Sequence, residues 1–224
     1  MLSGTFTNMI FTGSCFFHKE KENILSDSQK TILIVEDDHK TSSLVALYLE
    51  KEGFRAAIVG CFGDPALAAA REMVAIPVLG PGETALAVAA TLGDKIMVLE
   101  PENEFVYPTE KMIAAYGYKD KVVGVHHLDV PLETCISGLT GDTEEAKEIS
   151  RRVADDVCKR VEAGGPHVII LGCIGLAGFM DIVSSSLKER GFNIPIVEPG
   201  IVAMRYARFL LDLGLNESRQ MWRK

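Results

Sequence analysis

The chain has 224 residues, of which 47% are apolar and 24% are charged, so it can bury a sizeable core. Its net charge of −8 argues against binding to nucleic acid or to an anionic membrane surface, because both are held mainly through lysine and arginine. No apolar run reaches the roughly 18–20 residues that a membrane-spanning helix needs. The composition therefore argues against a nucleic-acid-binding protein and against a membrane protein.

The cysteines, at positions 15, 61, 135, 158 and 173, are odd in number and widely spaced. This pattern predicts reduced thiols in the cytoplasm, because disulfide frameworks use paired cysteines in short secreted chains. The chain has no CxxC motif and no close cysteine and histidine group with metal-ligand spacing. We therefore expect no zinc site.

Residues 1–29 show no clear period and include a run of alternating charges, which predicts a poorly ordered leader. They lack the basic start and the long apolar segment of a signal peptide. Residues 31–38 then form an expected strand that ends in Glu36, Asp37 and Asp38, and helical spacing follows over residues 41–51. The simplest interpretation of the three acids is a solvated strand end.

This opening resembles the start of a response-regulator receiver domain, in which paired acids hold Mg²⁺ beside a phosphoacceptor aspartate. Gly82 and Glu83 stand where the resemblance would require that aspartate. A non-enzymatic, receiver-like regulatory module therefore stays an alternative, and so does metal binding by the three acids.

Residues 56–59 are apolar and lead into Gly60 and Cys61, which predicts a buried strand that presents a thiol at its end. Asp64 suits the N-cap of the following helix and Pro65 its first position. The pattern returns at residues 167–175, where an apolar run again ends in glycine, Cys173 and a further glycine. Two similar units each presenting a cysteine suggest a pair of thiols that face one ligand, although two strand-end core cysteines would give the same pattern.

Between and after the two cysteines, strands alternate with helices, which predicts parallel sheets covered on both faces. Helices are expected at residues 65–73, 83–91, 109–116, 142–162, 179–190 and 201–213, and strands at residues 76–79, 95–99, 122–125, 167–171 and 194–197. Residues 126–141, with His126 and His127, are expected to be rich in loops. Glu83 and Glu198 are interpreted as charges at helix and strand ends, with contact to a site as the alternative.

Four segments together resemble the hydantoin and allantoin racemases of the aspartate/glutamate/hydantoin racemase superfamily. They are the two cysteine motifs, residues 60–72 and 171–176, and the two strand-and-glycine segments, residues 76–85 and 194–200. The resemblance covers about residues 56–215. The first 55 residues depart from it, because Glu36-Asp37-Asp38 stands where the family has an asparagine-rich substrate loop.

The resemblance implies an α/β fold of two flavodoxin-like parallel-sheet units with the active site in the cleft between them. The first unit would comprise residues 30–94 plus 197–224 and carry Cys61, and the second would comprise residues 95–196 and carry Cys173. It further implies a homo-oligomer.

The implied reaction is cofactor-independent racemisation at the carbon alpha to a carbonyl, on a small molecule such as a 5-substituted hydantoin or allantoin. Cys61 and Cys173 would be the acid/base pair, because inversion needs a base on one face of the carbon and an acid on the other. Backbone N–H groups of the glycine segments would hold the developing enolate oxygen. The expected substrate-binding residues are Phe62, Gly63, Gly80, Pro81, Gly82, Ile174 and Gly175.

Residues 100–104 carry three acids where the family has hydroxyl side chains. Such a loop would repel a carboxylate substrate, which favours a neutral ring. The alternatives are other chemistry of the superfamily, namely amino-acid racemisation or decarboxylation, and an inactive chimera.

Overall fold

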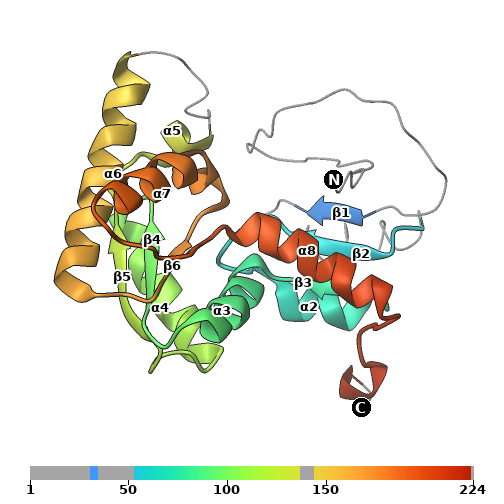
Figure 1. Cartoon of the computed structure of the whole chain (residues 1–224). Coiled ribbons are helices and arrows are strands. Elements are labelled where there is room, and N and C mark those ends of the chain that lie inside the picture. The colour runs from blue at the N-terminus through green and yellow to red at the C-terminus, as the bar shows by residue number, and fades with distance from the viewer. Residues whose placement is uncertain (1–30, 35–52, 137–143, 223–224) are drawn as a thin grey trace. The chain divides into compact units, whose positions relative to one another are not determined.

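A computed structural model describes residues 31–34, 53–136 and 144–222 (Figure 1). The expected leader, the acids at 36–38 and the helix at 41–51 lie outside the described residues. The strands are β1 (Thr31–Ile34), β2 (Ala56–Val59), β3 (Val78–Leu79), β4 (Ile96–Glu100), β5 (Val122–His127), β6 (Val168–Leu171) and β7 (Ile196–Val197). The α-helices are α2 (Leu67–Met73), α3 (Pro81–Leu92), α4 (Val106–Ala115), α5 (Leu132–Ile136), α6 (Glu144–Gly164), α7 (Met180–Glu189) and α8 (Pro199–Asp212). Short 3-10 helices are η1 (Asn103–Phe105), η2 (Ile174–Phe179) and η3 (Arg219–Trp222).

The described residues form two compact units, one within residues 1–81 and 203–224 and the other within residues 82–202. The fold class is therefore as predicted, an α/β protein with two parallel sheets. The domain limits expected from the sequence, with a division after residue 94, stay a prediction.

The first unit is built on a three-stranded parallel sheet in the order β1-β2-β3. β2 is central, with Leu33 level with Ile58 and Ile58 level with Leu79. All four residues of β2 are buried, as expected of a strand that is covered on both faces.

Helices cover both faces of this sheet (Figure 1). On one face, Ala57 and Val59 pack in a cluster with residues of α2. On the other face, Ala56 and Ile58 pack against Ala203 and other residues of α8. Because the side chains of β2 alternate between the two clusters, the strand is held rigidly and its carboxyl end is fixed.

The second unit contains a four-stranded parallel sheet in the order β5-β4-β6-β7. β4 and β6 are the inner strands, and every residue of both is buried. β5 lies at one edge and is only half-buried, with Val123 51% exposed. The carboxyl ends of β4 and β6 lie side by side, since Leu99 is level with Leu171.

The larger core of the second unit lies between its sheet and the helices α6 and α7. Figure 1 shows these two helices side by side along one side of the sheet. α6 contributes Val153, Val157 and Val161, whose spacing places them on one stripe of an amphipathic helix. From the sheet, Leu99 and Leu171 enter the same cluster.

Several element limits differ from the sequence prediction. β5 continues through both histidines, two residues further than expected, and the segment after it, expected to be rich in loops, contains the short helix α5. α3 begins at Pro81, two residues earlier than expected, because proline at the first helical position needs no N–H partner. Among the described helices, none is long and apolar enough to span a bilayer.

Candidate functional site

Cys61 lies in the turn that follows β2 and is partly exposed. The turn is tight, because the Asp64 N–H donates a hydrogen bond to the Cys61 carbonyl at 3.1 Å. Gly63 lies beside the thiol, since a Cβ placed on it would be 3.9 Å from the Cys61 Sγ. Phe62 points into the protein and is buried. The predicted residues Phe62 and Gly63 are therefore close to Cys61, one as packing and one as a small neighbour.

The turn continues through backbone that non-glycine residues rarely adopt. Asp64 and Ala66 have φ values of 51° and 57°, in the left-handed region. Ala66, and not Asp64, is the N-cap of α2, which begins at Leu67 and has no side-chain cap. The predicted N-cap is therefore wrong. Instead, the buried Asp64 carboxyl group lies against Gly80, where a Cβ would come within 2.5 Å of Asp64 Cγ.

This contact links the Cys61 turn to the end of β3. Gly80 follows β3, and Pro81 and Gly82 are the first residues of α3. The segment expected to be a glycine loop is therefore a strand end followed directly by a helix. The amino-terminal turn of a helix favours negative charge near it, which is compatible with the oxygen-binding role expected of this segment.

Cys173 occupies a different local structure at the end of β6. It is partly exposed and forms the N-cap of η2, which runs directly into α7. The Leu176 N–H donates to the Cys173 carbonyl at 3.0 Å. The Gly172 N–H donates to the Leu99 carbonyl at 2.6 Å, which ties this strand end to β4.

Ile174 and Gly175 follow Cys173 and pack inside the second unit. A Cβ on Gly175 would lie 2.9 Å from the Cβ of Cys135, so glycine is required here by the close approach of α5. Ile174 is buried and lies near Gly200, at the start of α8. The structure thus explains both residues by packing, and their predicted contact with a substrate stays a prediction.

Glu100 does not lie in an acidic loop, as expected from the sequence. It is the last residue of β4 and only 2% exposed. The Thr109 Oγ1 donates a hydrogen bond to Glu100 Oε1 at 2.6 Å. Burial raises the pKa of Glu100 to about 8, and the hydrogen bond from Thr109 offsets only part of that rise. In the sequence, Glu100 directly follows the apolar residues 96–99, and this position indicates the end of a buried strand.

The acids that follow Glu100 do not form one continuous negatively charged loop that would repel a carboxylate substrate. Glu102 Oε2 accepts a hydrogen bond from the Leu132 N–H at 3.1 Å, and Glu104 is exposed. With a pKa of about 8, Glu100 is largely neutral at pH 7. The argument that this segment repels carboxylate substrates therefore loses its main support.

Glu198 serves as the cap of α8. Its buried side chain accepts hydrogen bonds from the Gly200 N–H at 2.9 Å and the Ile201 N–H at 2.5 Å. Burial raises the pKa of Glu198, and these two hydrogen bonds act against the rise. Glu198 therefore lies at the junction of β7 and α8, at the strand end expected from the sequence.

The two histidines lie at the end of the edge strand β5. His127 Nδ1 is 2.8 Å from Asp129 Oδ1, and the His127 carbonyl accepts a hydrogen bond from Arg160 at 3.2 Å. His126 lies against Gly124, and burial, with the nearby Arg160 charge, lowers the pKa of His126. Both histidines have structural neighbours that account for their positions.

Cys135 and Cys158 differ from Cys61 and Cys173 in their burial. Both are buried in the core of the second unit, and burial raises the pKa of Cys135 to about 12. A thiol with that pKa stays protonated at neutral pH and does not act as a base. Within the described ranges, no group of histidine, cysteine and acidic residues could hold a metal ion.

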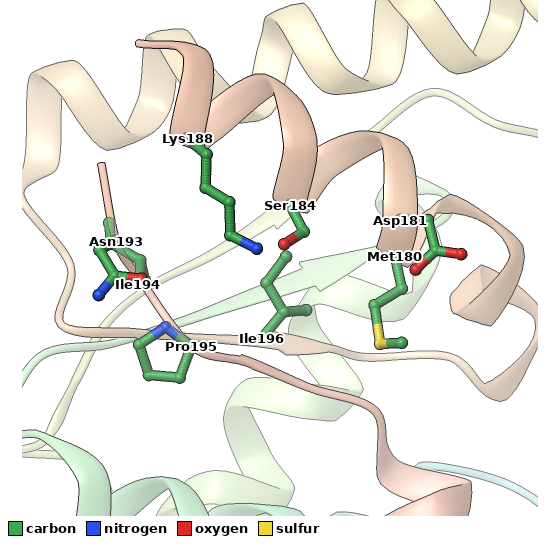
Figure 2. Close-up of a pocket in the computed structure, with 8 residues that line it drawn as sticks. All are labelled: Met180, Asp181, Ser184, Lys188, Asn193, Ile194, Pro195 and Ile196. Carbon is green, nitrogen blue, oxygen red and sulfur yellow. The ribbon is translucent and has the colours of Figure 1, made fainter. Parts of the chain in front are cut away.

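A pocket of about 380 Å³ lies elsewhere in the second unit, between α7 and the segment that leads into β7. Figure 2 shows side chains from α7, including Lys188 and Ser184, directed toward Pro195 and Ile196. None of the predicted site residues lines this pocket. It therefore adds nothing to the assignment of the cysteines.

Comparison with known proteins identifies the family. Residues 25–207 match the Asp/Glu/Hydantoin racemase family. A hydantoin racemase of Pseudomonas sp. (strain NS671) is 27% identical over 170 residues, which are 76% of this chain and 64% of that protein. A hydantoin racemase of Rhizobium meliloti is 28% identical over 175 residues, which are 76% of this chain and 66% of that protein. The chain thus spans slightly less than two thirds of the length of these relatives.

A solved structure has the same fold. The allantoin racemase from Klebsiella pneumoniae aligns with a TM-score of 0.67 and 23% identity, over 80% of this chain and 68% of that protein. At this identity the similarity concerns the fold alone. It agrees with the two parallel sheets described above.

Proposed function

Because the chain belongs to the Asp/Glu/Hydantoin racemase family, we propose that it is a cofactor-independent racemase that acts on the carbon alpha to a carbonyl. Cys61 and Cys173 are its acid/base pair. The proposed substrate is a small molecule, a 5-substituted hydantoin or allantoin. A homo-oligomeric assembly and a cytoplasmic location remain predictions of the sequence.

The observation that carries this proposal is the contrast among the cysteines of the described residues. Cys61 and Cys173 are partly exposed, and each directly follows the glycine at the carboxyl end of an inner strand. Cys135 and Cys158 are buried. In parallel α/β sheets, ligands bind beyond the carboxyl ends of the strands, and this general rule supports the two partly exposed thiols as the acid/base pair.

The proposed reaction moves two protons and leaves the bonds to carbon otherwise unchanged. One cysteine, as thiolate, takes the proton from the alpha carbon, and the electron pair of the C–H bond passes into the adjacent carbonyl as an enolate. The other cysteine, as thiol, gives its proton to the opposite face of the carbon. The two cysteines end with exchanged protonation states, which proton exchange with solvent restores.

The local structure around Cys173 supports thiolate formation. Cys173 immediately precedes the backbone N–H groups of η2, and thiols at the start of a helical segment have lowered pKa values. Around Cys61, the small Gly63 leaves room for a ligand to approach the Sγ closely. The enolate oxygen would be held by backbone N–H groups of Gly63, Gly80 and Gly82, since Pro81 has no N–H to donate.

The choice of substrate class rests on the relatives, both of which are hydantoin racemases. Amino-acid racemisation stays the second candidate, since a largely neutral Glu100 removes the expected repulsion of carboxylates. Decarboxylation by one thiol is the third. These candidates predict different products and are therefore separable in one assay.

The first test is proton exchange in D₂O. The full chain is incubated with each enantiomer of a 5-substituted hydantoin, and loss of the C5 proton is followed by NMR together with optical rotation. We expect exchange above the enzyme-free rate with loss of rotation. Allantoin, aspartate and glutamate are then tested in the same way.

Variants assign the reaction to the two thiols. Cys61→Ala and Cys173→Ala should each abolish racemisation, because removing either group leaves one face of the carbon without an acid or base. Cys158→Ala is the matched control, since it removes a buried thiol of α6, and it should keep the activity. Racemisation that survives either of the first two substitutions would exclude the two-thiol mechanism.

A further inference from the structure

Glu100 lies at the carboxyl end of an inner strand, next to the strand end that is followed by Cys173. It ends β4, which lies between β5 and β6. His127 of β5 is level with Glu100 on one side, and on the other side Gly172 follows the pair of Leu99 and Leu171. Glu100 is therefore the residue of β4 next to the Gly172-Cys173 strand end.

The carboxyl group of Glu100 rests directly on Gly172. A Cβ placed on Gly172 would lie 2.5 Å from Glu100 Oε1 and 2.8 Å from the Leu99 carbonyl oxygen. No L-amino acid with a side chain fits in that space without a shift. Gly172 is thus the residue that allows the acid to lie against the strand end.

The groups that face Glu100 from neighbouring elements give its negative charge little support. α4 contributes the Thr109 hydroxyl, which donates to Oε1, and β6 contributes only the backbone at Gly172. From β5, His127 is the level residue, and its Nδ1 is engaged by Asp129. Burial raises the pKa of Glu100 to about 8, and the hydrogen bond from Thr109 lowers it by less than burial raises it. Among the described residues, no lysine or arginine contributes to this change in pKa.

Cys173 lies on the other side of the same backbone. Successive side chains of a strand alternate between faces, and Cys173 packs against the core cluster of Leu171 and Leu176. Glu100 and the Cys173 thiol therefore flank Gly172 from opposite faces. Because the Glu100 side chain is buried, a negative charge on it would be poorly screened by water from the strand end that it contacts.

We propose that Glu100 is a positioning residue for Cys173: in its neutral form it packs against Gly172 and holds the strand end, and after it loses its proton its charge opposes formation of the Cys173 thiolate. The role of Cys173 as a base rests on the proposed function. The consequence is a coupled titration, in which the two groups share two apparent proton-loss steps.

The test measures the thiolate directly. Wild type and Glu100→Gln are alkylated with iodoacetamide between pH 6 and pH 10.5, and the rate at Cys173 is followed by mass spectrometry of its peptide. Glutamine keeps the size of the side chain but never ionises. We expect the midpoint of Cys173 alkylation to fall by about one pH unit in the variant, because a like charge beside a thiol raises its pKa.

Glu104→Gln is the matched control, since it removes the same charge from an exposed site on the segment that follows β4. Its alkylation midpoint should equal that of wild type. A second variant, Thr109→Val, keeps the Glu100 carboxyl group and removes the hydrogen bond that favours its ionised form. Its Cys173 midpoint should move from the wild-type value toward that of Glu100→Gln.

Equal midpoints in wild type, Glu100→Gln and Thr109→Val would overturn the proposal. If Glu100→Gln does not fold, Thr109→Val decides alone. The alkylation rate needs no substrate, so a chain that shows the shift without any proton exchange in D₂O would contradict the proposed function and leave the coupling in place.

Discussion

The two cysteines follow the same short sequence pattern, but the chain beyond them is built differently. After Cys61, the backbone passes through Asp64 and Ala66 in the left-handed region before the seven-residue helix α2 begins. After Cys173, no residue up to the end of α7 has a positive φ, glycines included, and η2 leads straight into α7. One thiol therefore sits on a strained turn and the other at the start of a continuous helical segment.

The two ends share a buried acid packed against a glycine. At the first, the Asp64 carboxyl group lies on Gly80, and at the second, the Glu100 carboxyl group lies on Gly172. In both, the contact joins the strand that bears the cysteine to its neighbour in the sheet. The two cysteine-bearing strand ends therefore share one kind of contact but differ in the backbone that follows the cysteine.

The largest expected effect concerns the glycines of these two contacts. Gly172→Ala should destabilise the protein by about 3 kcal/mol or more, because the new methyl group meets both the Glu100 carboxyl and the Leu99 backbone. Gly80→Ala should cost about 1–3 kcal/mol, because the three atoms nearest to the new methyl group all belong to the Asp64 side chain, which can shift more readily than backbone. Urea unfolding measures both values.

Gly178→Ala is the control for these substitutions, since nothing lies within 4 Å of a Cβ at that position in η2. It should change the free energy of unfolding by less than about 0.5 kcal/mol. If the Gly172→Ala protein were as stable as the Gly178→Ala protein, the Glu100 carboxyl group would not be tightly packed against Gly172. The two cysteine-bearing strand ends would then not share a close contact between an acid and a glycine.

The next effect is the pH dependence of stability that Glu100 confers. Its pKa is about 8 in the folded protein, against an ordinary value of 4.5. Between these values the folded state holds a proton that the unfolded state has lost, so stability falls as pH rises, by at most about 1.4 kcal/mol per pH unit. Glu100→Gln has no such loss and should become more stable relative to wild type through this window.

The difference in free energy of unfolding between Glu100→Gln and wild type, measured at half-unit steps from pH 5 to pH 9, gives this dependence. It should grow up to about pH 8 and stay level above it. Glu104→Gln, at an exposed position, should show a flat difference. A flat difference for Glu100→Gln would mean that the acid is ionised in the folded state.

A smaller effect is expected at the far end of α2. Arg219, in η3, donates from one guanidinium group to the carbonyl oxygens of Arg71 at 3.2 Å, Glu72 at 3.0 Å and Val74. These bonds satisfy carbonyls at and just beyond the last turn of the helix that follows Cys61. Arg219→Ala should therefore destabilise the protein by about 1–2 kcal/mol.

Hydrogen exchange measured by mass spectrometry locates that loss. Protection should fall in the α2 peptide and stay unchanged in α7, which belongs to the other unit. Arg151→Ala, which removes an exposed ion pair with Glu148, should cost less than about 0.5 kcal/mol. Equal losses for the two arginine variants would exclude a holding role for Arg219.

The smallest effect tests the strain of the Cys61 turn. Ala66→Gly should stabilise the protein by about 0.5 kcal/mol, because a left-handed residue with a Cβ is unfavourable by about 1–2 kcal/mol and glycine is not. Ala69→Gly, inside α2 and exposed, should have the opposite sign and cost about 1 kcal/mol. Thermal unfolding measures both, and a destabilised Ala66→Gly protein would argue against strain at the turn.

Much of the fold could be predicted from the sequence, because apolar runs of strand length alternate with helical patterns along the chain. The strand before each cysteine and the order of the later elements were found in this way. The N-cap of α2 was predicted wrongly, because the Asp64 side chain turns toward Gly80, which lies far along the chain. Local propensity cannot contain such a contact.

The α/β class, the two strand-glycine-cysteine motifs and the family can be predicted from the amino-acid sequence, because they depend on patterns within short segments. The environment of each candidate group became visible only in the folded chain. The structure shows that Glu100 is buried beside Gly172, that Gly175 is small because Cys135 approaches it, and that Cys135 and Cys158 are core residues. The physical reason is that the burial and the protonation of a side chain depend on its neighbours in space. The parallel sheet brings together residues such as Glu100 and Gly172, which lie far apart in the chain.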